Sequence, residues 1–415
     1  MAALPDWYRK GFLDEWAWDL LTVLVRLGLF ALRSLRHCTA AVFLTLIIFD
    51  LQPGLICSPS AASNKEKKMG NKILEDERID QRIKDVLGQI DMDSAMTHFS
   101  TREEMMAFEQ TEEAKAAKGI IQMINNAEHC KAVVPSDGLV AVTKEFMSQP
   151  DGNKIKIQYI RPDTQDTLPC VYYIHGGGME VGSCFDELYA AWGRCIARQN
   201  VAVAMVDFRN ARWPSSAPEV APFPAGLNDC VSGLKWVHAN ASELNIDAKK
   251  IIVAGESGGG NLTIATGLRL KQEGALDLVT GLYPLCPYIA GYWPLPENPS
   301  SVENEGILLR LHSDGAASHG AVCYGIEELQ KKNPLAWPGF CSVEDVQGLP
   351  RTYIIVNECD PLRDEGINFY RLLRKAGVDA QCRQVMGSIH GTDVFLGCIE
   401  ISDETASSIA NFCRQ

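Results

Sequence analysis

The sequence lacks three features that would each assign a chain to a broad class of protein. It has no excess of basic residues, because 39 Lys and Arg stand against 52 Asp and Glu, for a net charge of -13. It has no C-x-x-C pair among its 14 cysteines. Its longest uncharged apolar run covers only residues 38–49. Its amino-acid composition is otherwise that of an ordinary globular protein, with 46% hydrophobic and 22% charged residues, which is enough for a sizeable core.

Each absence excludes a class of partner or compartment. The negative charge argues against a nucleic-acid partner, since such proteins carry basic surfaces. The missing C-x-x-C pair argues against a structural zinc site or a thioredoxin-like centre, and we expect no metal. Scattered cysteines in a chain of this length are typical of free thiols in a reducing compartment. We therefore expect a cytoplasmic protein, and the sequence carries no signal for an oligomeric state.

Residues 1–68 form a hydrophobic N-terminal extension that differs from the remainder of the chain. Within it, residues 17–57 are apolar but carry scattered charges. A membrane-spanning helix needs about 20 apolar residues, more than this segment offers without interruption. Basic residues before the run and small residues at 57–63 are features of a signal sequence or signal anchor. Membrane association through residues 17–57 is therefore one interpretation. The alternatives are an amphipathic helix that lies on the protein, and an upstream segment that is absent from the working protein.

Residues 69–135 are charged and helical in character. Met105, Met106 and Phe108 follow one another there, and we interpret them as the packing face of an amphipathic helix in preference to a substrate-facing patch. From residue 136 onward the pattern changes to short apolar strands that alternate with helices. This alternation predicts an α/β fold with a mostly parallel central sheet and helices on both faces.

The expected elements fall between residue 138 and the C-terminus. A first antiparallel strand pair surrounds the turn "QPDGN". Residues 286–345 form a long insertion, which predicts a lid or pocket element; Trp293, Trp337 and Phe340 in it are expected in the core more than on the pocket wall. The expected strands are 170–174, 201–208, 251–255, 278–283 and 352–357, and the expected helices are 187–199, 226–239, 258–273 and 364–376.

The stretch "IIVAGESGGGNL", residues 251–262, is the most informative motif. Its glycine spacing suits a phosphate-binding loop, but Asn261 stands where that loop requires lysine. A dinucleotide-binding fingerprint would need glycine in place of Ser257. What remains is G-x-S-x-G, with Gly255 and Gly259 around Ser257, after an apolar strand and before a helix. That context predicts a nucleophile elbow, in which the serine hydroxyl projects from a strained turn.

A nucleophilic serine requires a base and an acid that orients the base. In a strand–elbow–helix fold these follow the serine in the order Asp or Glu, then His. His390 lies in a glycine-flanked loop after an apparent strand, whereas His312 and His319 fall in the lid-like insertion. For the acid, Asp360 directly follows a buried strand. Asp364 ranks second as a helix-starting residue, and Glu358 ranks third.

The run His175-Gly176-Gly177-Gly178 follows a strand directly and predicts an oxyanion loop. Glycines let backbone N–H groups point at the developing negative charge with no side chain between. We expect the donors to be the N–H groups of Gly176, Gly177 and Gly258. His175 is then a structural hydrogen-bonding residue of the loop and not the base.

Together these motifs resemble the hormone-sensitive-lipase family of α/β-hydrolases, over about residues 138–415. The resemblance implies an α/β-hydrolase fold with a helical cap formed by residues 69–135. It also implies hydrolysis of small to medium carboxylic esters through an acyl-enzyme, with no cofactor, and it gives Ser257, Asp360 and His390 as the triad. The motifs that carry it are "HGGG" at 175–178, "FPAGLND" at 223–229, "GESGG" at 255–259, "DPLRDEG" at 360–366 and "HG" at 390–391.

Two positions beside the nucleophile depart from the family pattern. The family usually has Asp before the serine and Ala after it, whereas this chain has Glu256 and Gly258. Glu256 keeps the charge, and Gly258 adds backbone freedom to the elbow. The same triad would also serve an amidase, a deacetylase or a lactonase. A non-catalytic ligand receptor on this fold is disfavoured, because no member of the triad is missing.

Overall fold

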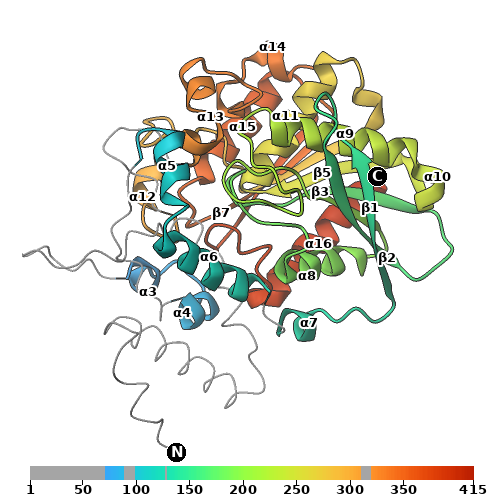
Figure 1. Ribbon diagram of the computed structural model, residues 1–415, viewed down its shortest axis with the longest axis horizontal. Helices are drawn as coiled ribbons and strands as arrows, with labels where there is room; N and C mark the ends of the chain where they lie inside the picture. Colours follow the sequence, from blue (N-terminus) through green and yellow to red (C-terminus); the bar gives the residue numbers. More distant parts are fainter. Residues whose placement is uncertain (1–70, 88–98, 127–128, 310–318) are drawn as a thin grey trace, which may run out of the picture.

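A computed structural model describes residues 71–87, 99–126, 129–309 and 319–415. Within these ranges one eight-stranded sheet runs in the order β1-β2-β4-β3-β5-β6-β7-β8 (Figure 1). β1 and β2 pair antiparallel, β2 pairs antiparallel with β4, and all later pairs are parallel. The strands are β1 Leu139–Met147, β2 Lys154–Pro162, β3 Leu168–Ile174, β4 Ala202–Val206, β5 Ile246–Glu256, β6 Gly281–Leu285, β7 Thr352–Asn357 and β8 Ala380–Val385.

Burial along the strands follows their place in the sheet. All residues of the central strands β4 and β6 are buried, as expected for parallel strands covered on both faces. The edge strand β1 is mostly exposed and carries Lys144 and Glu145, which discourage pairing with another chain. The expected strand at 278–283 begins later than predicted, because the short helix η2 (Leu276–Leu278) comes first.

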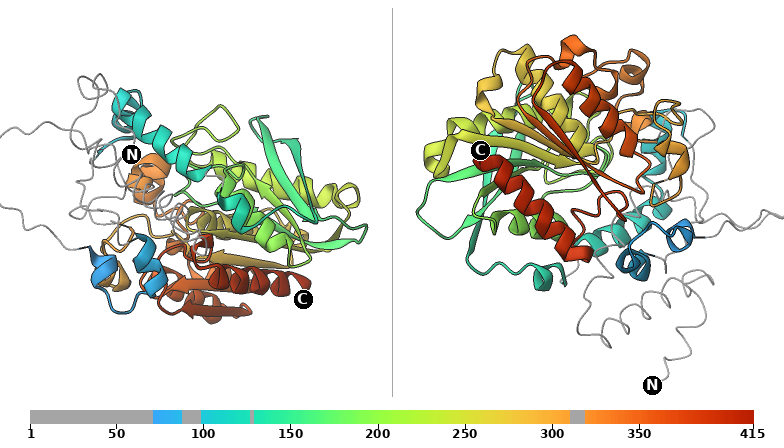
Figure 2. Two further views of the ribbon diagram at one scale, coloured as in Figure 1. Left: turned by 90° about the horizontal axis from the view of Figure 1, so that it is seen from below. Right: turned by 180° about the vertical axis from the view of Figure 1, so that it is seen from behind.

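Helices cover both faces of the sheet, as the alternating pattern predicts (Figures 1 and 2). α8 and α16 contact each other and lie on one face, whereas α9, α11 and α15 contact strands on the other. The C-terminal helix α16 was not among the expected elements. The bounds are α8 Glu187–Ala197, α9 Ala225–Ala239, α10 Ala241–Leu244, α11 Gly258–Gln272, α15 Arg363–Lys375, η4 Leu396–Cys398 and α16 Ile399–Arg414.

Five helices precede the sheet within the described residues. A capping box between Thr101 and Glu104 starts α5. Met105 is fully buried in the core, whereas Met106 and Phe108 are only partly buried, so the packing interpretation is confirmed for Met105. α5 contacts α13. The bounds are α3 Lys72–Glu75, α4 Gln81–Leu87, α5 Arg102–Phe108, α6 Glu112–Asn125 and α7 His129–Val133.

The insertion between β6 and β7 holds α12 (Ser300–Glu303), α13 (His319–Gln330), η3 (Pro338–Phe340) and α14 (Val343–Val346). Trp293 and Trp337 are fully buried there, and both rings lie against Tyr288, with centroids 5.3 and 5.4 Å away. Phe340 is half-buried. The expectation that these aromatic residues serve the core is therefore confirmed for both tryptophans.

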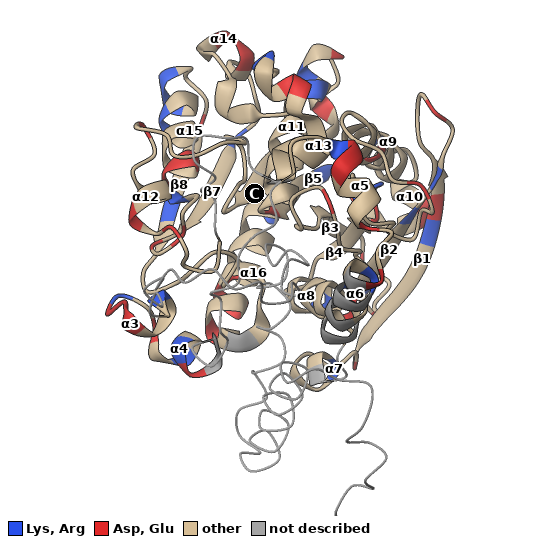
Figure 3. Cartoon of the chain, turned by 60° about the vertical axis from the view of Figure 1, so that its left-hand side comes forward, with Lys and Arg blue, Asp and Glu red and all other residues tan. Residues whose placement is uncertain are grey.

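Several expectations fall outside the described residues: the extension 1–68, its apolar part 17–57, and His312. No helix within the described ranges combines the length and apolar character needed to cross a membrane. None of the described cysteines forms a disulfide. Basic and acidic residues both occur along the outer helices, as the blue and red segments of the ribbon show (Figure 3).

Candidate active site

Ser257 occupies the tight turn between β5 and α11. Its backbone angles are φ 56° and ψ -117°, a strained combination for a residue with a side chain. The turn is pinned at both ends, since the N–H of Ser257 donates to Leu285 and its carbonyl accepts from Asn261 and Tyr288. α11 begins immediately afterwards, so the positive end of its dipole faces the serine. The local geometry is that of the predicted nucleophile elbow.

His390 and Asp360 meet Ser257 at the carboxyl edge of the sheet. The Nε2 atom of His390 lies 2.9 Å from Oγ of Ser257, and its Nδ1 atom lies 2.8 Å from Oδ2 of Asp360. The other carboxylate oxygen of Asp360 accepts the N–H of Leu362 at 2.8 Å. With Nδ1–H donated to Asp360, Nε2 can accept a proton from the serine. Although burial lowers the pKa of His390, the neighbouring Asp360 carboxylate and Cys286 raise it well above 6.5.

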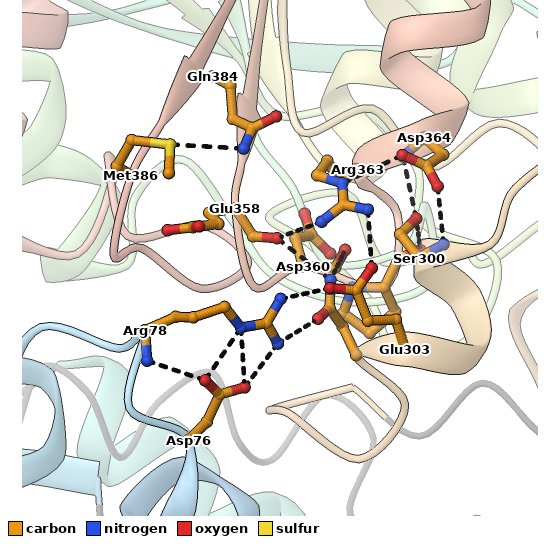
Figure 4. Close-up of polar contacts among 12 residues, drawn as sticks. Asp76, Arg78, Ser300, Glu303, Glu358, Asp360, Arg363, Asp364, Gln384 and Met386 are labelled. Carbon is orange, nitrogen blue, oxygen red and sulfur yellow. Dashed lines mark hydrogen bonds and ion pairs between the residues drawn. The ribbon is translucent and has the colours of Figure 1, made fainter.

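The two alternative acids have structural partners elsewhere (Figure 4). Oδ2 of Asp364 accepts the N–H of Ser300 at 2.7 Å, and its Oδ1 accepts from Arg363. Glu358 accepts the N–H of Gly387 at 2.7 Å, so it fixes the loop that carries His390. Neither carboxylate is recorded in contact with His390. Of the three candidate acids, Asp360 is the one whose carboxylate contacts His390, at 2.8 Å.

The charged cluster beside Asp360 joins distant parts of the chain. Arg78, which lies between α3 and α4, contacts Asp76 at 2.6 Å and Glu303 of α12 at 2.5 Å (Figure 4). Arg363 contacts the same Glu303 at 3.0 Å and donates to the carbonyl of Glu358 at 2.9 Å. These contacts tie the segment before the sheet to the turn that holds Asp360.

The glycine run lies directly over the elbow. A Cβ atom on Gly258 would lie only 2.6 Å from the backbone nitrogen of Met179 and 2.8 Å from that of Gly178. One on Gly259 would lie 2.1 Å from the carbonyl oxygen of Ile174. The glycine at 258 is thus explained by close approach of the loop, in addition to the backbone freedom that its sequence position suggests.

One expected donor of the loop is already engaged. The N–H of Gly176 donates to Oε1 of Glu256 at 2.6 Å. Gly177 and Gly178 have positive φ angles, and among the described residues no partner is recorded for their N–H groups. The geometry therefore differs from the expectation that Gly176 faces the oxyanion, because its N–H serves a buried carboxylate. The N–H groups of Gly177, Gly178 and Gly258 are therefore the candidate donors.

Glu256 is the buried residue that links the elbow to this loop. Besides Gly176, its carboxylate accepts the hydroxyl of Tyr173 at 2.5 Å and that of Tyr189 at 2.8 Å. Burial raises the pKa of Glu256 to about 7, against the opposing effect of these hydrogen bonds. From the sequence, Glu256 was expected only to keep the negative charge that the family has at this position. Its contact with Gly176 could not be expected, because it depends on how the glycine loop folds over the elbow.

His175 packs behind the loop, away from the triad. Its Nδ1 atom lies 2.9 Å from the carbonyl oxygen of Gly176, and its ring stacks on Phe208 at a centroid distance of 4.4 Å. Burial lowers the pKa of His175, although Asp207 opposes this, so the neutral ring donates to Gly176. These contacts agree with a structural part for His175 in holding the loop.

A second buried glutamate organises the segment after β6. Oε2 of Glu365 accepts the N–H groups of Ile289 and Ala290 at 2.8 Å each, and Oε1 accepts from Nε1 of Trp293 at 2.7 Å. Burial raises the pKa of Glu365 to about 8. Sequence reasoning did not single out this residue, although it belongs to the motif at 360–366. It fixes the start of the insertion beside the elbow.

Residues before the sheet contact the glycine loop at 176–178 through one intermediate segment. Glu109, which follows α5, accepts from Nε of Arg212 at 2.6 Å and from Nε1 of Trp213 at 2.7 Å. The neighbouring Ala211 donates its N–H to the carbonyl of Met179 at 2.9 Å. Residues 211–213 therefore connect Glu109, which lies before the sheet, to the loop over Ser257.

Comparison with known proteins now identifies the family. A family model described as the α/β-hydrolase fold matches residues 171–394. The chain belongs to the α/β-hydrolase family. This α/β-hydrolase superposes on the structure of esterase Est22 with a TM-score of 0.79 and 59% identity, over 83% of this chain and 100% of that chain.

More distant members of the family agree. The structure of brefeldin A esterase, described as a bacterial homologue of human hormone-sensitive lipase, matches with 32% identity and a TM-score of 0.69, over 83% of this chain and 95% of that chain. An arylesterase of Saccharolobus solfataricus is 31% identical over 64% of this chain and 80% of its own length. The resemblance to the hormone-sensitive-lipase family is thereby confirmed.

Proposed function

We propose that the chain is a serine carboxylesterase that hydrolyses small to medium carboxylic esters through an acyl-enzyme. The observation that carries the proposal is the continuous pair of hydrogen bonds from Ser257 through His390 to Asp360, at 2.9 and 2.8 Å. Relatives named arylesterase, esterase Est22 and brefeldin A esterase support hydrolysis of carboxylic esters.

In this proposal Ser257 attacks the ester carbonyl while Nε2 of His390 takes the hydroxyl proton. Asp360 holds the tautomer of His390 and stabilises the imidazolium that forms. The N–H groups of Gly177, Gly178 and Gly258 stabilise the tetrahedral oxyanion, aided by the N-terminus of α11. His390 then gives the proton to the leaving alcohol, and water releases the acid by the same sequence.

The proposed compartment is the cytoplasm, supported by the free state of all described cysteines. The proposed cap, residues 69–135, and the lid formed by 286–345 would shape the substrate pocket. Membrane association through residues 17–57 is the alternative for location. Cell fractionation of the full chain and of a chain that begins at residue 69 tests this, because recovery in the membrane fraction only with residues 1–68 present would favour the anchor.

The activity is tested with p-nitrophenyl acetate, butyrate and octanoate. We expect turnover of the short esters and a loss of at least about 10³-fold in kcat for Ser257→Ala. Ser407→Ala, on the half-buried face of α16, is the matched control and should stay within about twofold of the wild type. Full activity of Ser257→Ala, or no turnover by the folded wild type, would refute the proposal.

A further inference from the structure

Cys286 lies beside the triad but has no part in the esterase reaction proposed above. It directly follows β6, its N–H donates to the carbonyl of Ile355 at 2.8 Å, and its side chain is buried. Its Sγ atom, a ring nitrogen of His390 and a carboxylate oxygen of Asp360 all lie within 4.8 Å of one another. No other group of three residues with this spacing of metal-ligating atoms occurs in the described part of the chain.

These three side chains are the ligand types that zinc prefers. Zinc binds cysteine sulfur at about 2.3 Å and histidine nitrogen or carboxylate oxygen at about 2.0–2.2 Å, which places two ligands of one tetrahedral ion about 3.5 Å apart. Small side-chain movements would therefore bring all three atoms onto one ion. A thiolate also selects a soft cation such as zinc over magnesium or calcium.

The three ligands follow neighbouring strands at one edge of the sheet. Cys286, Asp360 and His390 follow β6, β7 and β8, which are neighbours in the sheet. The second carboxylate oxygen of Asp360 is held by the N–H of Leu362 at 2.8 Å, a contact that can stay in place while the first oxygen binds an ion. The ring nitrogen that faces Asp360 is Nδ1, so an ion shared with this carboxylate would bind Nδ1.

We propose that Cys286, Asp360 and His390 form an inhibitory binding site for a thiophilic divalent cation, with Zn²⁺ as its representative. Binding replaces the thiol proton of Cys286, which passes to water. With the ion on Nδ1, the ring of His390 keeps one proton, on Nε2, and any second proton passes to water. Nε2 then cannot accept the proton of Ser257. The inhibition rests on the proposed esterase mechanism, whereas binding of the cation does not.

Binding is tested on the full chain with Co²⁺ in place of Zn²⁺. A thiolate-bound Co²⁺ gives a charge-transfer absorption band in the near ultraviolet, and Zn²⁺ added in excess should remove it. We expect the band in the wild type, its loss in Cys286→Ser, and its retention in Cys382→Ser, a control at a half-buried thiol. Asp360→Asn should weaken it as an independent ligand change. No band in the wild type, or the same band in Cys286→Ser, would overturn the proposal.

Inhibition is tested by titrating Zn²⁺ into the p-nitrophenyl acetate assay, with each variant compared with its own zinc-free rate. The zinc concentration for half-inhibition should rise at least about tenfold in Cys286→Ser and stay unchanged in Cys382→Ser. A chelator should restore the wild-type rate. An unchanged midpoint in Cys286→Ser contradicts the inhibitory site even if the esterase is active. If the esterase proposal itself fails, the cobalt band still decides whether the cation binds.

Discussion

Ser257 has side chains on one side, here called the base side, and glycine-rich backbone on the other, here called the oxyanion side. On the base side, side chains do the positioning: His390 contacts Ser257 at 2.9 Å and Asp360 contacts His390 at 2.8 Å. On the oxyanion side, the backbone of Gly178 and Met179 approaches the elbow so closely that no room is left for a Cβ atom on Gly258. The base side therefore depends on which side chains are present, and the oxyanion side depends on where side chains are missing.

A buried acid accompanies each side but with a different partner. Asp360 holds the imidazole of His390, whereas Glu256 holds the backbone of Gly176. A change on the base side should therefore remove the proton acceptor, and a change on the oxyanion side should displace donors while leaving the proton acceptor in place. Variants on each side separate these two effects.

The largest effect is expected on the base side, from Asp360→Asn. Asparagine keeps the volume of the side chain, but its amide group can donate a hydrogen bond to Nδ1 of His390. The imidazole then carries its proton on Nε2, which is the wrong tautomer for a base, and kcat should fall by about 10⁴-fold. Steady-state kinetics with p-nitrophenyl acetate measures this. The control is Asp364→Asn, whose carboxylate contacts Ser300 and Arg363 and not the imidazole. A similar loss in both variants would mean that the acid was assigned wrongly.

Gly258→Ala tests the oxyanion side. The added methyl group must displace either the elbow or the backbone of Gly178 and Met179, so kcat should fall by about 10²-fold with a smaller change in KM. Gly119→Ala on α6 is the control, since among the described residues no atom outside the adjoining turns of α6 lies within 4 Å of the position its Cβ would take. Wild-type kcat in Gly258→Ala would show that the loop does not need its close approach.

Glu256→Gln should act on the same side more weakly. Removing the charged acceptor loosens the bond to Gly176 and displaces the following donors, which should lower kcat by about tenfold. Glu365→Gln provides the comparison, because Glu365 is equally buried but contacts the segment at 289–293. We expect it to change KM more than kcat. Equal kcat losses in the two variants would contradict a specific link between Glu256 and the oxyanion loop.

The smallest effect is a difference in the pH dependence of stability. Burial raises the pKa of Glu256 from 4.5 to about 7, so between these pH values the unfolded chain loses a proton that the folded chain keeps. The contribution of Glu256 to the free energy of unfolding is therefore complete below pH 4.5 and is lost as pH rises through about 7. The free energy of unfolding, measured with urea at several pH values, should decline less steeply with rising pH in Glu256→Gln than in the wild type. An unchanged slope would argue against this buried carboxyl as a source of the decline.

The base side could be predicted from the sequence, and the reason is chemical. Only a few residue types can act as a base or as the acid that orients it. Among these, the order along the chain and the position after a strand left His390 and Asp360 as the best candidates. The fold followed from the same alternation of buried strands and helices that placed Ser257 on a turn. α16 was missed, although it covers one face of the sheet.

The oxyanion side could be predicted only in outline. Every residue except proline carries an N–H group, so residue type does not tell which one is free. The run at 176–178 located the loop, but the engagement of Gly176 depends on Glu256, a side chain 80 positions away in the sequence. The role of Gly258 likewise became clear only from the distance to the backbone of Met179. Contacts between distant segments decide these points, and local sequence does not contain them.

The most direct test of the account is covalent labelling with a fluorophosphonate, followed by peptide mass spectrometry. If Ser257 is the nucleophile, each chain should gain one adduct, on the peptide that contains Ser257. Ser257→Ala should not be labelled, and Asp360→Asn should be labelled much more slowly. Attachment at another serine, or labelling that persists in Ser257→Ala, would show that Ser257 is not the nucleophile.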